Sequence, residues 1–111
     1  MLSGYFAPAG STAKGLATLS VPLIKNINDK LDAASAGAGF KTADVATAFD
    51  TYVPFTTTVT WQGNQIPVAV AKVCAWTWAC STPPSGPNIH ANKNGYLEIV
   101  GVFQKAIGKL S

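Results

Sequence analysis

The sequence contains a single histidine, His90, in a loop rich in proline and glycine. A neutral imidazole can take a proton from a hydroxyl group, so His90 is the candidate general base of this chain. The loop leads directly into a segment with apolar residues at helical spacing, which favours a positioned side chain. The alternative is a solvated loop residue without a chemical role.

Cys74 and Cys80 are the only cysteines, and Trp76 and Trp78 lie between them. An even pair at short separation indicates a disulfide, which would stabilise the fold by about 2 kcal/mol and belong to an oxidising compartment. Two buried thiols in a reducing compartment are the alternative. One histidine and two cysteines fall short of the four ligands of a structural zinc site, so no metal is expected.

The segment after His90 predicts a C-terminal helix, with Asn92 or Asn94 as its cap. Aromatic residues on the apolar face of such a helix usually pack in a core, and Tyr96 and Phe103 are predicted there. The apolar positions at helical spacing are Tyr96, Ile99 or Val100, Phe103, Ile107 and Leu110.

A second helix is predicted over residues 11–36, ended by Gly37 and Gly39. Pro22 interrupts its pattern, so the helix is continuous or nearly so, or a second helix begins there with Ser20 as its cap. Residues 1–10 are expected to be irregular. The apolar face of the predicted helix consists of Leu16, Leu19, Leu23, Ile27, Leu31 and Ala34.

Between the two helices, residues 40–45 predict a short strand and residues 45–49 a turn or short helix, with Asp44 as its cap. Residues 56–61 have high β-propensity and either pair through a turn at Gly63-Asn64 or form a long loop. Residues 68–80 are too apolar for an exposed segment.

The composition limits the classes of function. With 111 residues the chain suffices for one domain, and its 12% of charged residues suggests that some faces are normally covered. The eight lysines are scattered and arginine is absent, which argues against nucleic-acid recognition. No apolar run approaches the length of a membrane span. Residues 1–5 lack the features of a signal peptide, so we expect a cytoplasmic chain or an export signal on other sequence.

The pattern His-x-Asn-x-x-Gly-Tyr from His90 to Tyr96, followed by an amphipathic helix, resembles the last signature block of the SGNH or GDSL-type esterases and lipases. The resemblance implies an α/β fold, the C-terminal part of a flavodoxin-like three-layer α/β/α domain. In this chain that part would be mostly helical with one or two short strands. Residues 1–111 would form a single, partial domain, and residues 40–45 would be the edge strand of its parallel sheet.

The implied activity is hydrolysis of carboxylic esters by a serine and His90, without cofactor or metal. In the family an aspartate two or three residues before the histidine orients the ring, and Pro87 and Asn88 stand at those places. Asn88 can accept a hydrogen bond but brings no negative charge. The pattern Cys-x-Trp-Thr-Trp-x-Cys resembles a secreted bacterial branch, which implies a Cys74–Cys80 disulfide and a secreted or cell-envelope location.

The chain departs from the family in the blocks that precede the histidine. No Asp-Ser pair occurs, the oxyanion-hole glycine block is absent, and the string at residues 26–29 lacks the glycine of Gly-x-Asn-Asp. The resemblance therefore leads us to expect a fragment of an esterase, a remnant with its own role, or one piece of a split enzyme. An ester or lipid substrate is expected only if an N-terminal part completes it. Val68, Val70 and Trp76 would then have lost the sheet that covers them.

Two other functions fit the same residues. One is a small secreted, non-catalytic binding or surface-interaction module in which Trp61, Trp76 and Trp78 contact a sugar or an interface. The other is self-association, in which two copies cover each other's exposed apolar faces.

Overall fold

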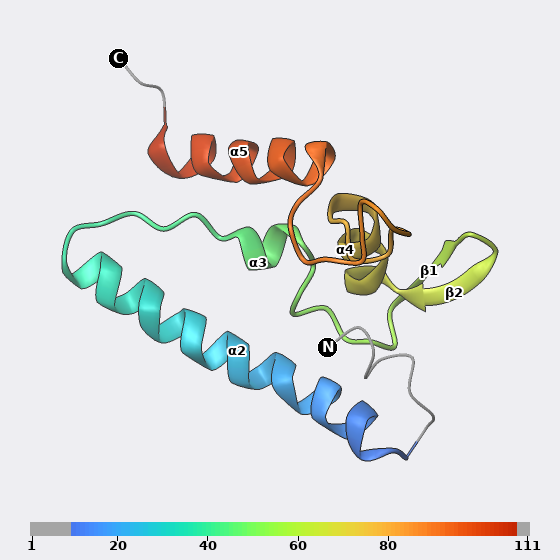
Figure 1. Cartoon of the computed structure of the whole chain (residues 1–111). Coiled ribbons are helices and arrows are strands. Elements are labelled where there is room, and N and C mark those ends of the chain that lie inside the picture. The colour runs from blue at the N-terminus through green and yellow to red at the C-terminus, as the bar shows by residue number, and fades with distance from the viewer. Residues whose placement is uncertain (1–9, 109–111) are drawn as a thin grey trace. The chain divides into compact units, whose positions relative to one another are not determined.

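The computed structural model describes residues 10–108, which form two units, one up to Phe40 and one from Lys41 (Figure 1). The described residues are mostly helical with one two-stranded sheet, which confirms the prediction at that level. The three-layer arrangement stays a prediction. The predictions made for residues 1–9 and for Leu110 concern positions outside the described residues. The elements are α2 (Thr12–Gly37), α3 (Val45–Ala48), β1 (Thr58–Trp61), β2 (Asn64–Pro67), α4 (Val68–Trp76) and α5 (Lys93–Ile107).

Helix α2 forms the first unit and agrees with the predicted range. The Ser11 hydroxyl caps it by accepting a hydrogen bond from the Lys14 N–H at 3.3 Å. Pro22 lies inside the continuous helix, and the Ser20 hydroxyl donates to the Ala17 carbonyl at 2.7 Å. Ser20 therefore does not begin a second helix.

The predicted strand at residues 40–45 is wrong. Residues 40–44 have no regular structure, and the Asp44 carboxylate caps α3 by accepting from the Thr47 N–H at 3.0 Å and from the Thr47 hydroxyl at 2.5 Å. A strand needs a neighbouring strand to pair with, and β1 and β2 pair only with each other in the described sheet. The cap and the short helix are as predicted.

Strands β1 and β2 form an antiparallel hairpin, so the paired alternative is correct for this segment. Its turn is Gln62-Gly63, one residue before the predicted position, with φ values of 48° and 81°. Two-residue hairpin turns favour such positive φ values because they match the twist of the strands. A cross-strand hydrogen bond from Gln65 Nε2 to Thr60 Oγ1, at 2.9 Å, supports the register.

Helix α4 begins directly after β2, and its start packs in the core of the second unit. The core consists of Ile66, Pro67, Ala69, Val70 and Ala71. The prediction that Val70 lacks cover is therefore wrong, because the hairpin contacts α4 within the same unit. Val68 and Trp76 are half-buried, and Trp76 packs edge-to-face on Phe49 with the ring centroids 5.0 Å apart.

Lys72 joins α4 to the segment around α3. Its Nζ lies 2.7 Å from an Asp50 carboxylate oxygen and donates to the Ala48 carbonyl at 2.9 Å. The same ammonium lies 5.0 Å from the centroid of the Trp76 ring. These contacts hold the first part of the second unit against the middle of α4.

Helix α5 starts against the end of α4, and the contact is so close that it requires a glycine. A Cβ atom on Gly95, which is buried, would lie closer than 3.0 Å to the carbonyl group of Trp76. The two backbones therefore approach more closely than any side chain would allow.

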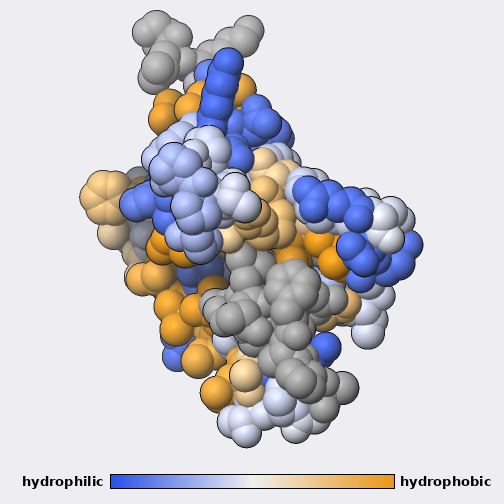
Figure 2. Space-filling model, turned by 45° about the vertical axis from the view of Figure 1, so that its right-hand side comes forward, coloured by the Kyte–Doolittle hydropathy of each residue, from blue (hydrophilic) through white to orange (hydrophobic). Residues whose placement is uncertain are grey.

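The outer face of α5 is exposed. Tyr96 and Phe103 are 57% and 50% exposed, so their predicted core positions are wrong in this structure. Helices α3 and α4 contact α5 but leave Tyr96 and Phe103 exposed. Helix α2 also exposes apolar residues, and Figure 2 shows hydrophobic residues at several places on the surface. No helix within residues 10–108 has both the length and the hydropathy for crossing a membrane.

We predict that Gly95→Ala lowers the free energy of unfolding by about 1–3 kcal/mol, because the added methyl group forces α5 away from α4. The matched control is Gly101→Ala in the same helix, where a Cβ meets nothing within 4 Å. That substitution should stabilise the helix by about 0.5–1 kcal/mol. Equal effects of the two substitutions in urea unfolding would contradict the close approach.

The exposed apolar faces predict self-association of the isolated chain, since apolar surface removed from water contributes about 25 cal/mol per Å². Light scattering should detect a dimer or a larger species. Val100→Lys with Phe103→Lys should shift it towards monomer, whereas Gln104→Lys, at an exposed polar position, should not. A monodisperse monomer of the unsubstituted chain would count against association.

Candidate functional site

The loop that carries His90 is closed at its base by a short antiparallel pairing. Thr77 and Ala91 form a bridge, flanked by hydrogen bonds from the Trp78 N–H to the His90 carbonyl at 3.0 Å and from the Asn92 N–H to the Trp76 carbonyl at 2.9 Å. Two segments more than ten residues apart in sequence therefore run side by side just beyond α4.

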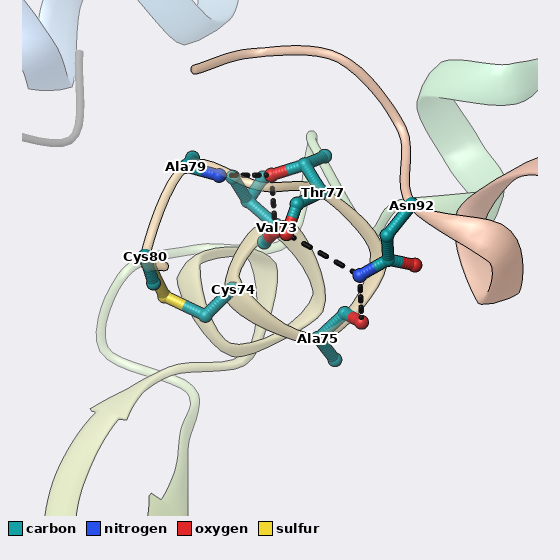
Figure 3. The surroundings of a disulfide bond; sticks show 7 residues. All are labelled: Val73, Cys74, Ala75, Thr77, Ala79, Cys80 and Asn92. Atoms are coloured by element: carbon teal, nitrogen blue, oxygen red, sulfur yellow. Dashed lines mark hydrogen bonds between the residues drawn. A yellow bond between two sulfur atoms is a disulfide. The ribbon is translucent and has the colours of Figure 1, made fainter. Parts of the chain in front are cut away.

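The carboxamide of Asn92 connects the two helix ends. Its oxygen accepts from the Gly95 N–H at 3.1 Å and caps α5. Its nitrogen donates to the carbonyls of Ala75 at 2.8 Å and Thr77 at 3.3 Å, at the end of α4 (Figure 3). Because helix ends leave N–H and C=O groups without helical partners, one side chain satisfies groups of both helices.

Thr77 and the disulfide fix the other side of the base. Thr77 is buried, and its hydroxyl donates to the Val73 carbonyl at 2.6 Å and accepts from the Ala79 N–H at 3.1 Å (Figure 3). Cys74 and Cys80 form the predicted disulfide, with their Cα atoms 4.9 Å apart. The bond joins the last turn of α4 to the start of the loop.

Gly86 and Asn88 order the loop itself. A Cβ on Gly86 would come within 3.0 Å of the carbonyl oxygens of Trp78 and Ser81, so only glycine fits there. The Asn88 N–H donates to the Trp78 carbonyl at 3.2 Å, and its side-chain nitrogen donates to the Ser85 carbonyl at 2.8 Å.

His90 is exposed, while both of its backbone polar groups are bound. Its N–H donates to the Asn88 side-chain oxygen at 3.0 Å, and its carbonyl accepts from Trp78. Asn88 therefore holds the His90 backbone. The imidazole forms no hydrogen bond or ion pair with the residues that the structure describes. The catalytic roles of His90 and Asn88 stay predictions.

Two residues of this site, Asn92 and Thr77, form structural hydrogen bonds that the sequence did not predict. Asn92 was one of two candidate caps, but its bonds to α4 depend on where α4 ends, which no local pattern shows. Thr77 gave no signal beyond its place between two tryptophans. Residues 10–108 contain no group of three or more His, Cys, Asp or Glu side chains that could hold a metal ion.

Comparisons with models of known protein families, with curated proteins and with solved structures find no match to this chain.

We predict that Asn92→Ala lowers the free energy of unfolding by about 2 kcal/mol, because it removes a cap and leaves two carbonyls without their donor. Asn92→Asp keeps the acceptor but not the donor, so it should recover only part of the loss. Asn94→Ala, at an exposed position of the same turn, is the control and should change stability by less than about 0.5 kcal/mol. Comparable losses at both asparagines in chemical unfolding would contradict the double role of Asn92.

Proposed function

We propose that this chain is the histidine-bearing part of an SGNH-type carboxylic ester hydrolase. His90 acts as the general base, and polypeptide outside these 111 residues provides the serine. The observation that carries the proposal is the exposed imidazole on a backbone bound at both its N–H and its carbonyl. A ring without internal hydrogen bonds is open to a hydroxyl that approaches from another segment.

In this reaction the serine oxygen attacks the ester carbonyl while His90 takes the serine proton. The imidazolium then gives this proton to the leaving alcohol, and the acyl group remains on the serine. Water, activated by the same ring, releases the acid and restores the serine. The sequence of steps uses neither a metal ion nor a cofactor.

Asn88 acts on His90 through the backbone in this proposal. Its side-chain oxygen is bound to the His90 N–H, and it carries no charge to stabilise an imidazolium. The ring N–H that faces away from the serine would then need a backbone carbonyl of the completing polypeptide as its acceptor. Replacing Asn88 should therefore change the position of the His90 backbone.

The exposed apolar face of α5 supports the proposal that another polypeptide segment packs on this helix. Tyr96, Val100, Phe103 and Ile107 are each about half exposed. A sheet or helix that carries the serine would cover them, and burial of this apolar surface would hold the two parts together.

The disulfide supports a proposal for location. A Cys74–Cys80 bond is typical of oxidising compartments, so we propose a secreted or cell-envelope protein. The substrate class is a carboxylic ester, including lipid esters, once the serine-bearing part is present.

The experiment compares the isolated chain with a completed polypeptide. The isolated chain should not hydrolyse short-chain aryl esters, since it has no serine block. The DNA upstream of Met1 should encode an in-frame Gly-Asp-Ser block, and the polypeptide that includes it should hydrolyse these esters. His90→Ala should lower kcat/KM of the completed polypeptide about 100- to 10,000-fold. The control Asn94→Ala should leave kcat/KM within about threefold of the parent.

The proposal fails if the isolated chain shows saturable turnover that is lost on His90→Ala. It also fails if no such block is encoded, or if the completed polypeptide keeps its activity without His90. The second candidate is then a non-catalytic binding module. Its supporting observation is the apolar surface of the loop, where Ile89 is 88% exposed and Trp78 is 38% exposed.

A further inference from the structure

The Trp78 backbone is bound to the His90 backbone next to the antiparallel bridge at the base of the loop. The Trp78 N–H donates to the His90 carbonyl, one position beyond the bridge between Thr77 and Ala91. The backbones of Trp78 and His90 are therefore neighbours at the base of the loop.

The neighbouring tryptophan has a different role. Trp76 is half-buried, packs edge-to-face with Phe49, and has the Lys72 ammonium over its ring. Trp78 is 38% exposed, while its backbone is bound at both its N–H and its carbonyl. An indole held in this way presents a flat apolar surface to solvent at low entropic cost.

The segment of the sequence that carries Trp78 and His90 has no charged residues. Residues 73–92 contain no Lys, Arg, Asp or Glu, in a chain with thirteen such residues, eight Lys and five acids. Arg and Lys side chains are the usual partners of phosphates and carboxylates, and the nearest lysines in sequence, Lys72 and Lys93, lie outside this segment. The segment itself therefore favours a neutral ligand with an apolar group.

We propose that Trp78 is a substrate-binding residue that contacts the apolar acyl or alcohol group of a neutral carboxylic ester and places its carbonyl beside His90. This inference rests on the proposed function, whose substrate class it narrows to uncharged esters with an apolar group. Binding to this surface does not need the serine, so the isolated chain can be tested for it.

The test uses the His90 ring as its own reporter. As the single histidine, it gives one Cε1–H signal in proton NMR spectra. Benzyl acetate, added to the isolated disulfide-bonded chain, should shift this signal saturably with a Kd in the millimolar range, a binding free energy of about −4 kcal/mol. Potassium acetate at the same concentrations should not shift it.

Substitutions test whether the ligand-induced shift of the His90 signal depends on Trp78. Trp78→Ala should weaken binding at least about tenfold, the effect of a lost aromatic contact, and Trp78→Phe should keep it within about threefold. The control Trp61→Ala, in strand β1, should leave the Kd unchanged. Trp78→Phe also separates a lost contact from a lost fold, since it retains an aromatic ring at this position.

The proposal is overturned if the parent gives no saturable shift, if Trp78→Ala binds as tightly as the parent, or if Trp61→Ala weakens binding to the same degree. Turnover by the completed polypeptide decides the proposed function separately. Activity that depends on His90, with a KM unchanged by Trp78→Ala, would remove Trp78 from the site and leave the hydrolase proposal standing.

Discussion

The second unit depends on the junction between the end of α4 and the start of α5, and the side-chain carboxamide of Asn92 joins these two helix ends. The end of α4 leaves carbonyl groups without partners and the start of α5 leaves N–H groups, and Asn92 supplies a donor to the first and an acceptor to the second. The missing Cβ of Gly95 lets the helices approach closely enough for this. Thr77 and the disulfide then fix the turn that follows α4.

The position of the candidate site follows from this junction. His90 lies two residues before Asn92, and Trp78 directly follows Thr77, so the bonds that hold the junction also hold both side chains at their backbones. Their rings remain exposed. A bound backbone with a free ring is the arrangement that a catalytic or binding group needs, because little freedom is lost when the ligand arrives.

Local signals determined which parts of the fold could be predicted. Ser11 and Asn92 are caps that act within one turn, so helices α2 and α5 and their starts could be read from the sequence. The prediction of a strand at residues 40–45 was wrong because a strand requires a partner strand, which the local sequence does not specify. Tyr96 was predicted in the core because helical periodicity shows which face is apolar, but not whether another element covers it. The bonds of Asn92 to α4 are likewise non-local.

Amide hydrogen exchange of the unsubstituted chain tests the central claim most directly. The N–H groups of Trp78 and Asn92 are bound across the junction, to the carbonyls of His90 and Trp76, and the Gly95 N–H is bound to the Asn92 side chain that joins the two helices. They should exchange slowly and at similar rates, as one cooperative unit, with protection of about 1,000-fold or more. Exchange of the three at unrelated rates, or close to the rates of an unfolded peptide, would contradict a junction that holds His90 in place.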